Sequence, residues 1–166
     1  MKQRGFTLIE LLLYIGLAGA ILLAVSIFLS IILASQVKNR AINEVEQQGR
    51  QIILLLEQAI SDAQAINSPA TGVSAPSLSI TSIEPLVNPV VFNLSGGKIR
   101  IIEGANSPVE LNSNQVIASA LSFVNLSRPA TAGLVRFSFT LQYLNDNNRQ
   151  ELNYAKTFYG SLNLKK

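Results

Sequence analysis

Apolar residues form one long run near the start of the chain. Leu11 to Ala34 is nearly all apolar, and residues 11–37 carry no charge. A helix rises about 1.5 Å per residue, so this run would be about 36 Å long, which is enough to cross a hydrocarbon core of about 30 Å. A secretory signal has a shorter apolar region and ends in a site such as Ala-x-Ala, which residues 32–36 (Ile-Leu-Ala-Ser-Gln) do not supply. We therefore predict a membrane-spanning helix that stays in the protein.

Beyond Val37 the apolar positions recur at alternating spacings of three and four, which is typical of an amphipathic helix. We predict one helix from Phe6 to Ile66, about 90 Å long, ended by Pro69. The stripe could form a coiled coil, but its Gly and Ala positions favour packing on the chain's own sheet. Its members are Ile42, Val45, Gly49, Ile52, Leu56, Ala59, Ala63 and Ile66.

After a Ser-, Pro-, Ala- and Gly-rich linker at 68–77, the apolar period changes to two. Residues 90–101 predict a hairpin that turns at Ser95-Gly96-Gly97. Leu121 and Phe123 suggest another strand, 135–143 gives the clearest one, and 152–164 gives the last strand or strands. One apolar face per strand predicts an antiparallel sheet with one face buried and one wet. A long helix followed by such a sheet is an α+β fold.

The composition disfavours an enzyme. There is no cysteine and no histidine, which excludes a disulfide, a thiolate metal site and the commonest general base. Glycine-rich phosphate loops are also missing from the sequence, and we expect no catalytic residue and no cofactor. The net charge of +3 forms no basic face, since Lys2, Arg4, Lys165 and Lys166 lie at the two ends. Nucleic acid is therefore an unlikely partner on sequence grounds.

A polar run from Asn145 to Glu151 could be interpreted as a calcium loop. An EF-hand loop needs alternate oxygen ligands, a glycine and a final glutamate at fixed spacing. This run lacks that spacing. A hydrated turn is therefore favoured, and no metal site is predicted.

Glu10 is an acidic residue at the edge of the apolar run. A carboxylate near membrane depth is costly, so such residues usually have a partner and a function. Solvation of Glu10 at the headgroup level is the alternative. Position alone leaves both interpretations open.

The residues around Glu10 favour the first interpretation. Lys2-Gln3-Arg4-Gly5-Phe6-Thr7-Leu8-Ile9-Glu10, followed by a long apolar helix, resembles the start of the type IV prepilin and pseudopilin family. The resemblance implies that prepilin peptidase cuts after Gly5, that the new N-terminal Phe6 is N-methylated, and that Glu10 acts in assembly. Lys2 and Arg4 would be the leader charges that keep the leader in the cytoplasm.

The same resemblance implies a ladle-shaped protein in four parts. They are a leader (1–5), a transmembrane and filament-core helix (6–37), its amphipathic continuation (38–67) and a globular β domain (68–166). Its expected role is a structural subunit of a type IV pilus or a type II secretion-like filament. Its expected partners are prepilin peptidase/N-methyltransferase, other pilin or pseudopilin subunits, inner-membrane lipid and the assembly platform. The C-terminal domain is expected outside the cytoplasm, and later on a filament or the cell surface.

Two features suggest a minor subunit. Residues 46–63 more loosely resemble minor pseudopilins of the J type, and the cysteines that close a loop in many major pilins are missing. The apolar helix also lacks the proline that many major pilins carry. Gly16 and Gly19 are weaker helix breakers and leave open whether this helix melts on assembly.

Two other functions remain open at the level of sequence. A single-pass membrane-anchored protein could bind or sense a ligand with its outer domain, and it would need neither cleavage after Gly5 nor Glu10. A surface adhesin or DNA-uptake subunit would share the filament and differ in its exposed face.

Overall fold

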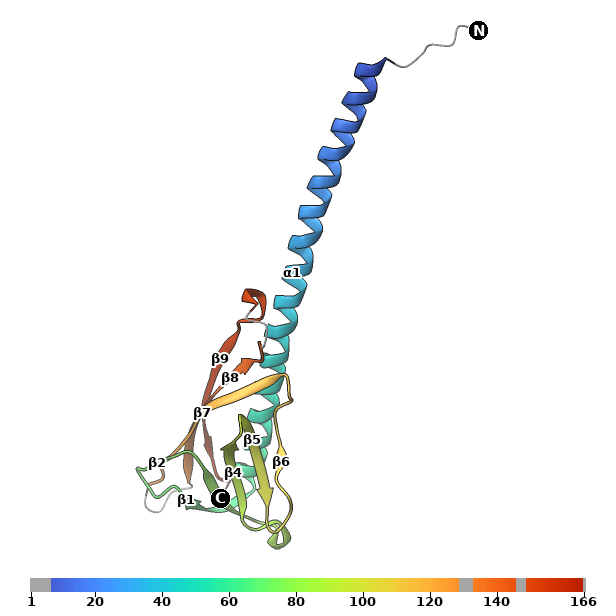
Figure 1. Ribbon diagram of the computed structural model, residues 1–166. Helices are drawn as coiled ribbons and strands as arrows, with labels where there is room; N and C mark the ends of the chain where they lie inside the picture. Colours follow the sequence, from blue (N-terminus) through green and yellow to red (C-terminus); the bar gives the residue numbers. More distant parts are fainter. Residues whose placement is uncertain (1–6, 129–132, 146–148, 166) are drawn as a thin grey trace.

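The computed structural model describes residues 7–128, 133–145 and 149–165. Helix α1 (Leu8–Ser61) has 54 residues, which corresponds to about 81 Å. Figure 1 shows its N-terminal half projecting away from the molecule, while its C-terminal half lies along the β domain. The predicted α+β architecture, a long helix packed on antiparallel strands, is confirmed.

The helix ends earlier than the predicted Ile66. Its last residue is Ser61, and the N–H of Asp62 donates to the carbonyls of Gln58 and Ile60. Residues 63–68 form strand β1 (Ala63–Ser68), which pairs with β3 (Leu78–Ser82). The spacing of three residues between Ala63 and Ile66 fits the helical stripe. In the structure both side chains pack in or against the core from strand β1. The predicted helix end was wrong because residues 63–68 form backbone hydrogen bonds with β3, and the spacing of apolar residues contains no information about that pairing.

Over the described residues the strands form two antiparallel sheets rather than the expected one. A five-stranded sheet has the order β1-β3-β4-β5-β6, and a four-stranded sheet has the order β2-β7-β8-β9. The sheets meet where the N–H of Ala118 donates to the carbonyl of Gly97, at 2.8 Å. The remaining strands are β2 (Ser74–Ala75), β4 (Val90–Ser95), β5 (Lys98–Glu103), β6 (Val109–Glu110), β7 (Val116–Asn125), β8 (Leu134–Tyr143) and β9 (Ala155–Asn163).

The predicted hairpin is β4–β5, in which Gly96 and Gly97 both have positive φ. The clearest predicted strand is β8. Strand β2 lies inside the segment predicted to be a linker, where it pairs with β7. Two short 3-10 turns complete the domain, η1 (Pro85–Val87) and η2 (Gln150–Leu152).

The core lies between the C-terminal half of α1 and the two sheets. Packing of the helical stripe against the chain's own strands, rather than in a coiled coil, is therefore confirmed. The buried helix positions are Ala41, Val45, Gln48, Gly49, Ile52, Leu56 and Ile60. The largest buried side chains of the same core are Phe92, Phe123, Phe137 and Phe139.

Candidate functional site at the start of the helix

The first turn of α1 is closed by a reciprocal pair, Thr7 and Glu10. Thr7 is the N-cap, and the N–H of Glu10 donates to its hydroxyl at 3.4 Å. In return, the backbone N–H and the hydroxyl of Thr7 donate to Glu10 Oε2, at 3.1 and 3.0 Å. This capping box satisfies backbone donors that a helix start leaves open. It also places the Glu10 carboxylate at the positive end of the helix dipole.

The sequence itself contains a signal for this cap. Thr7-Leu8-Ile9-Glu10 has the Thr-x-x-Glu pattern of a capping box before an apolar run. Sequence reasoning selected Glu10 for its charge and for its place in the prepilin-like motif, and it gave Thr7 no role. Thr7 holds one oxygen of the Glu10 carboxylate, so the two residues act as a unit.

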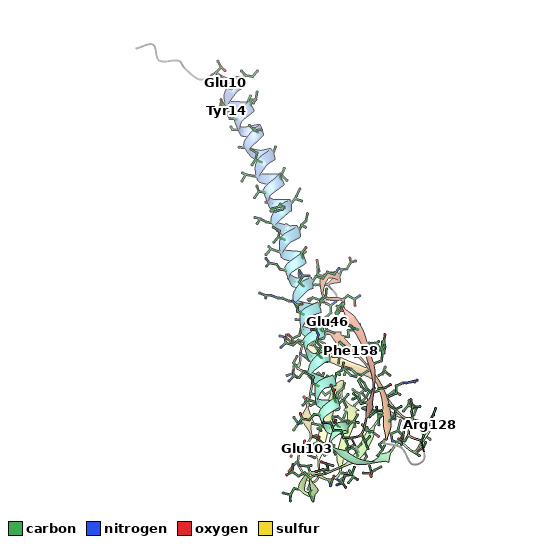
Figure 2. All side chains as sticks on the ribbon, turned by 180° about the vertical axis from the view of Figure 1, so that it is seen from behind. Glu10, Tyr14, Glu46, Glu103, Arg128 and Phe158 are labelled. Atoms are coloured by element: carbon green, nitrogen blue, oxygen red, sulfur yellow. The ribbon has the colours of Figure 1, made fainter. Side chains whose placement is uncertain are left out.

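The other predicted residues of this region are Lys2, Arg4, Gly5 and Phe6. They lie outside the residues that the structure describes. The scissile bond after Gly5, the methylation of Phe6 and the leader charges therefore stay predictions. Glu10 is three residues from the first described residue, and Figure 2 shows it near the outer end of the helix.

The following half of α1 is apolar and uncovered. Residues 7–31 are all exposed, and they include the large side chains from Leu8 to Ile31. An exposed apolar surface of this extent marks a membrane or protein contact. Over the described residues, α1 is the helix found to be long and apolar enough to cross a membrane. The Ser30 hydroxyl is satisfied within the helix, since it donates to the carbonyl of Ser26 at 2.9 Å.

Where α1 enters the domain, Glu46 fixes it to strand β9. Lys156 Nζ and the Tyr154 hydroxyl both donate to Glu46 Oε1, and Tyr154 does so at 3.2 Å. The hydrogen bond from Lys156 holds the pKa of Glu46 below its ordinary value. Burial, and then the hydrogen bond to Glu46, raise the pKa of Tyr154. This cluster ties α1 to β9 and to the residue before it, near the point where the free half of the helix leaves the domain.

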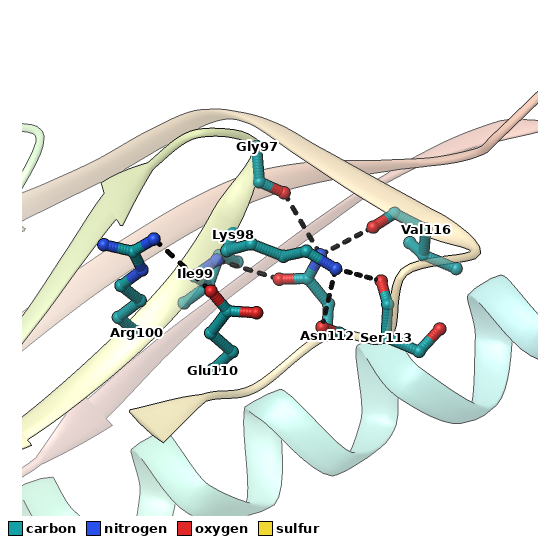
Figure 3. A network of polar contacts seen from close by, with 8 residues as sticks. All are labelled: Gly97, Lys98, Ile99, Arg100, Glu110, Asn112, Ser113 and Val116. Carbon is teal, nitrogen blue, oxygen red and sulfur yellow. Dashed lines mark hydrogen bonds and ion pairs between the residues drawn. The ribbon is translucent and has the colours of Figure 1, made fainter. Parts of the chain in front are cut away.

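A second polar connection lies further along the helix. The buried Gln48 donates to Ser113 Oγ at 2.6 Å, and the N–H of Ser113 donates to Gln48 Oε1 at 3.0 Å. Asn112, the residue before Ser113, connects this loop to β5 and to the start of β7, as Figure 3 shows. No sequence signal predicts these contacts, because Gln48 and Ser113 are 65 residues apart.

Both polar atoms of the Asn112 side chain form hydrogen bonds with the backbone of the strands and the turn beside them. Its Oδ1 accepts from the N–H of Ile99 at 2.8 Å, and its Nδ2 donates to the carbonyls of Gly97 and Val116 at 3.1 and 2.6 Å. Lys98 Nζ adds bonds to the carbonyls of Asn112 and Ser113. The polar groups of this region are therefore engaged in holding strands together.

The described residues show no group of three or more acidic side chains arranged to hold a metal ion. The predicted turn at Asn145–Glu151 lies partly outside them, since 146–148 are not described. Of its described part, Asn145 Nδ2 donates to the carbonyl of Arg149 at 2.7 Å, and the N–H of Arg149 donates to Asn145 Oδ1 at 2.9 Å. Asn145 thus closes a loop with its side chain.

Comparison with known proteins adds one finding to this geometry. The family described as the prokaryotic N-terminal methylation motif matches residues 1–34. No curated protein and no solved structure matches the chain. The match covers the predicted leader, the Thr7–Glu10 cap and the whole exposed stretch of the apolar helix at 7–31.

Proposed function

We propose that this chain, which fits the type IV prepilin and pseudopilin family by its methylation motif and long apolar helix, is a structural subunit of a type IV pilus or a type II secretion-like filament. It is not an enzyme. The observation that carries the proposal is the continuity of the motif with a half-helix that the domain leaves uncovered. That surface first faces lipid, as a single-pass membrane anchor, and then other subunits in the filament.

Processing prepares this surface for assembly. Prepilin peptidase/N-methyltransferase cuts after Gly5 and methylates Phe6, the new N-terminal residue. The inner membrane holds the helix, the C-terminal domain lies outside the cytoplasm, and the assembly platform extracts the subunit. Exchange of lipid for neighbouring helices then gains free energy from packing and polar pairing rather than from hydrophobicity.

Glu10 supplies the polar pairing. The amine of a neighbouring subunit's Phe6 is cationic after cleavage, and a carboxylate left alone among apolar helices is strongly unfavourable. The capping box fixes the position of the Glu10 carboxylate for this pairing, because the N–H and the hydroxyl of Thr7 already donate to Glu10 Oε2. A carboxylate has about four acceptor sites, so Glu10 can take the neighbour's amine while it keeps the cap.

We favour a minor subunit. The support is the similarity of residues 46–63 to minor pseudopilins of the J type, together with the missing cysteines. A minor subunit would act with other pilin or pseudopilin subunits in the filament.

The experiment separates the charge of Glu10 from its role in the cap. Glu10→Gln removes the charge but keeps an oxygen that can accept from Thr7, whereas Thr7→Val removes the hydroxyl and keeps the charge. A third variant, Glu10→Ala, removes both the charge and the oxygens that accept from Thr7. All three variants are expressed in a host with an active assembly system. Membrane insertion is measured by fractionation, and incorporation by co-purification with sheared filaments.

We expect all three variants to insert into the membrane. Glu10→Gln and Glu10→Ala should lose incorporation by tenfold or more, whereas Thr7→Val should lose little. Normal incorporation of Glu10→Gln would overturn the pairing. An equal loss in Thr7→Val would assign Glu10 to the cap instead.

A further inference from the structure

The end of the domain opposite to the free half of α1 presents an apolar loop (Figure 1). This loop, residues 83–89, includes η1 and exposes 67% of Ile83 and 86% of Leu86. Asn88 holds it in place, since its Nδ2 donates to the carbonyl of Ser82 at 3.0 Å and its Oδ1 accepts from the N–H of Ser82. The apolar side chains are thus displayed on a fixed turn, which lowers the entropy cost of binding.

A groove of about 340 Å³ runs beside this loop, between the last turns of α1 and strands β4 and β5. We call it the distal groove. Its floor is apolar and includes Leu55, Ala59 and Ile101, and its rim carries the carboxylates of Asp62, Glu84 and Glu103. Figure 2 shows Glu103 at this lower end of the domain. Among the described residues, the ion pairs engage Glu46, Glu110 and Glu151, so the three rim carboxylates have no ion pair.

The complementary charges lie at the other end of the covered half of the same helix. Lys38 and Arg40 are exposed, and neither takes part in an ion pair over the described residues. Arg40 and Asp62 are about 33 Å apart along α1 at about 1.5 Å per residue. Unpaired cations and unpaired acids are therefore separated along the axis, too far apart to meet within one chain.

We infer that the distal groove of one copy receives the Lys38–Arg40 segment of a second copy, displaced by about 33 Å along the helix axis. The inference rests on the proposed function, since it requires copies with parallel helices. In this displacement Leu33 of the second copy lies level with the groove floor at Leu55, next to the exposed Leu54. Arg40 follows Leu33 by seven residues, about two turns, and so lies on the same face of the helix. Arg40 is therefore the cation that meets the acidic rim, whereas Lys38 lies about 200° away around the axis. Apolar residues of both copies cover each other beside this contact.

This contact joins two different surfaces of the same chain. Because the second copy is displaced along the axis, this head-to-tail contact cannot close into a ring, so it extends and leaves a free surface at each end. The two free ends are the acidic groove of the last copy and the basic segment of the first. The proposed occupant of the groove is a second copy of this chain, because its exposed Arg40 supplies the charge that complements the acidic rim.

Cysteine crosslinking tests the contact in the full chain, which has no cysteine of its own. Arg40→Cys and Asp62→Cys are placed in one chain, in a host with an active prepilin peptidase and assembly system. A disulfide needs Cα atoms within about 7 Å, so positions 40 and 62 cannot join within one copy. We expect a ladder of dimers and higher multimers on a non-reducing gel.

Three controls make the ladder specific. Each single-cysteine chain should stay monomeric, as should Arg40→Cys combined with Arg136→Cys, which lies on the exposed face of β8. The proposal is overturned if assembled chains give no ladder, or if position 62 crosslinks to a different subunit instead.

Charge reversal provides a second readout. Glu84→Lys with Glu103→Lys should lower incorporation into filaments about tenfold, because two or three exposed pairs become repulsive. Addition of Lys38→Glu and Arg40→Glu should restore incorporation, which a merely structural defect would not allow. Failure of that restoration contradicts the contact.

The fate of the unaltered chain distinguishes this inference from the proposed function. If the function itself fails, the unaltered chain keeps residues 1–5 and is missing from sheared filaments. If only the contact fails, the unaltered chain is processed and incorporated, but neither the ladder nor the restoration is seen.

Discussion

The ring of Phe158 in β9 lies directly on Gly49 of α1. A Cβ built on Gly49 would overlap three ring carbons, Cζ, Cε1 and Cε2. The ring cannot easily move away, because Phe139 is stacked against it at a centroid distance of 5.3 Å and Lys156 Nζ lies 5.2 Å from its centroid. The missing side chain at position 49 therefore sets how closely the helix approaches the four-stranded sheet.

Gly49→Ala should destabilise the domain although alanine is the better helix former. Overpacking a filled core costs about 1–3 kcal/mol, which exceeds the gain of about 1 kcal/mol in helix propensity. Urea unfolding of the detergent-solubilised chain, followed by near-ultraviolet circular dichroism, measures the loss. Gly16→Ala is the matched control, because a Cβ there meets nothing within 4 Å. Equal effects at both positions would contradict this account of the contact.

Asn112→Ala should cost about 2–3 kcal/mol of unfolding free energy, because it leaves one backbone N–H and two carbonyls without their side-chain partner. Asn93→Ala in β4 is the control, since the buried Oδ1 of Asn93 has no hydrogen-bond partner. The same unfolding assay compares the two variants. A larger loss from Asn93 than from Asn112 would show that the Asn112 bonds do not hold the loop.

The Glu46–Lys156 pair should make stability depend on pH in the acid range. The pKa of Glu46 is lowered in the folded chain, so its contribution is present above the unfolded value of about 4.3 and is lost as the pH falls through the folded value. The effect is at most about 1 kcal/mol, because Lys156 is 41% exposed. Lys156→Met should flatten the stability curve below pH 5. An unchanged curve would show that the pair contributes nothing.

Ala120 adopts a backbone conformation that disfavours a side chain. Its φ is +53°, at the register shift between Ser119 and Ser122 in β7. Ala120→Gly should relieve about 1–2 kcal/mol of strain and lose less than that in chain entropy, for a net gain of about 0.5 kcal/mol. Ala118→Gly, at a buried position of the same strand, should destabilise. Thermal unfolding compares them, and a loss at both positions would contradict the strain.

The sequence predicted those parts of the fold whose pattern is local. The alternation of Val135, Phe137 and Phe139 identifies β8, and the glycine pair at 96–97 identifies the hairpin. Ala63 and Ile66 were misassigned, because their spacing fits a helix and their strand exists only through pairing with β3. The division into two sheets and the Gln48–Ser113 connection depend on segments far apart in the chain, which no local pattern encodes.

The candidate site divides in the same way. Glu10 was predicted from its charge beside a long apolar run and from the prepilin-like motif around it. The Thr-x-x-Glu pattern of the same residues also encodes its cap by Thr7. The distal groove was not predictable, since it joins α1, the loop at 83–89 and β5. Its acidic rim exists only once those elements are folded together.

The mass of the mature chain tests the central claim most directly. The full chain is purified from cells with an active prepilin peptidase, and its N-terminal peptide is identified by mass spectrometry. The account predicts that removal of five residues from the 166 leaves 161, beginning at Phe6 with a methylated amine. A chain that keeps Lys2, Arg4 and Gly5 in those cells would contradict it.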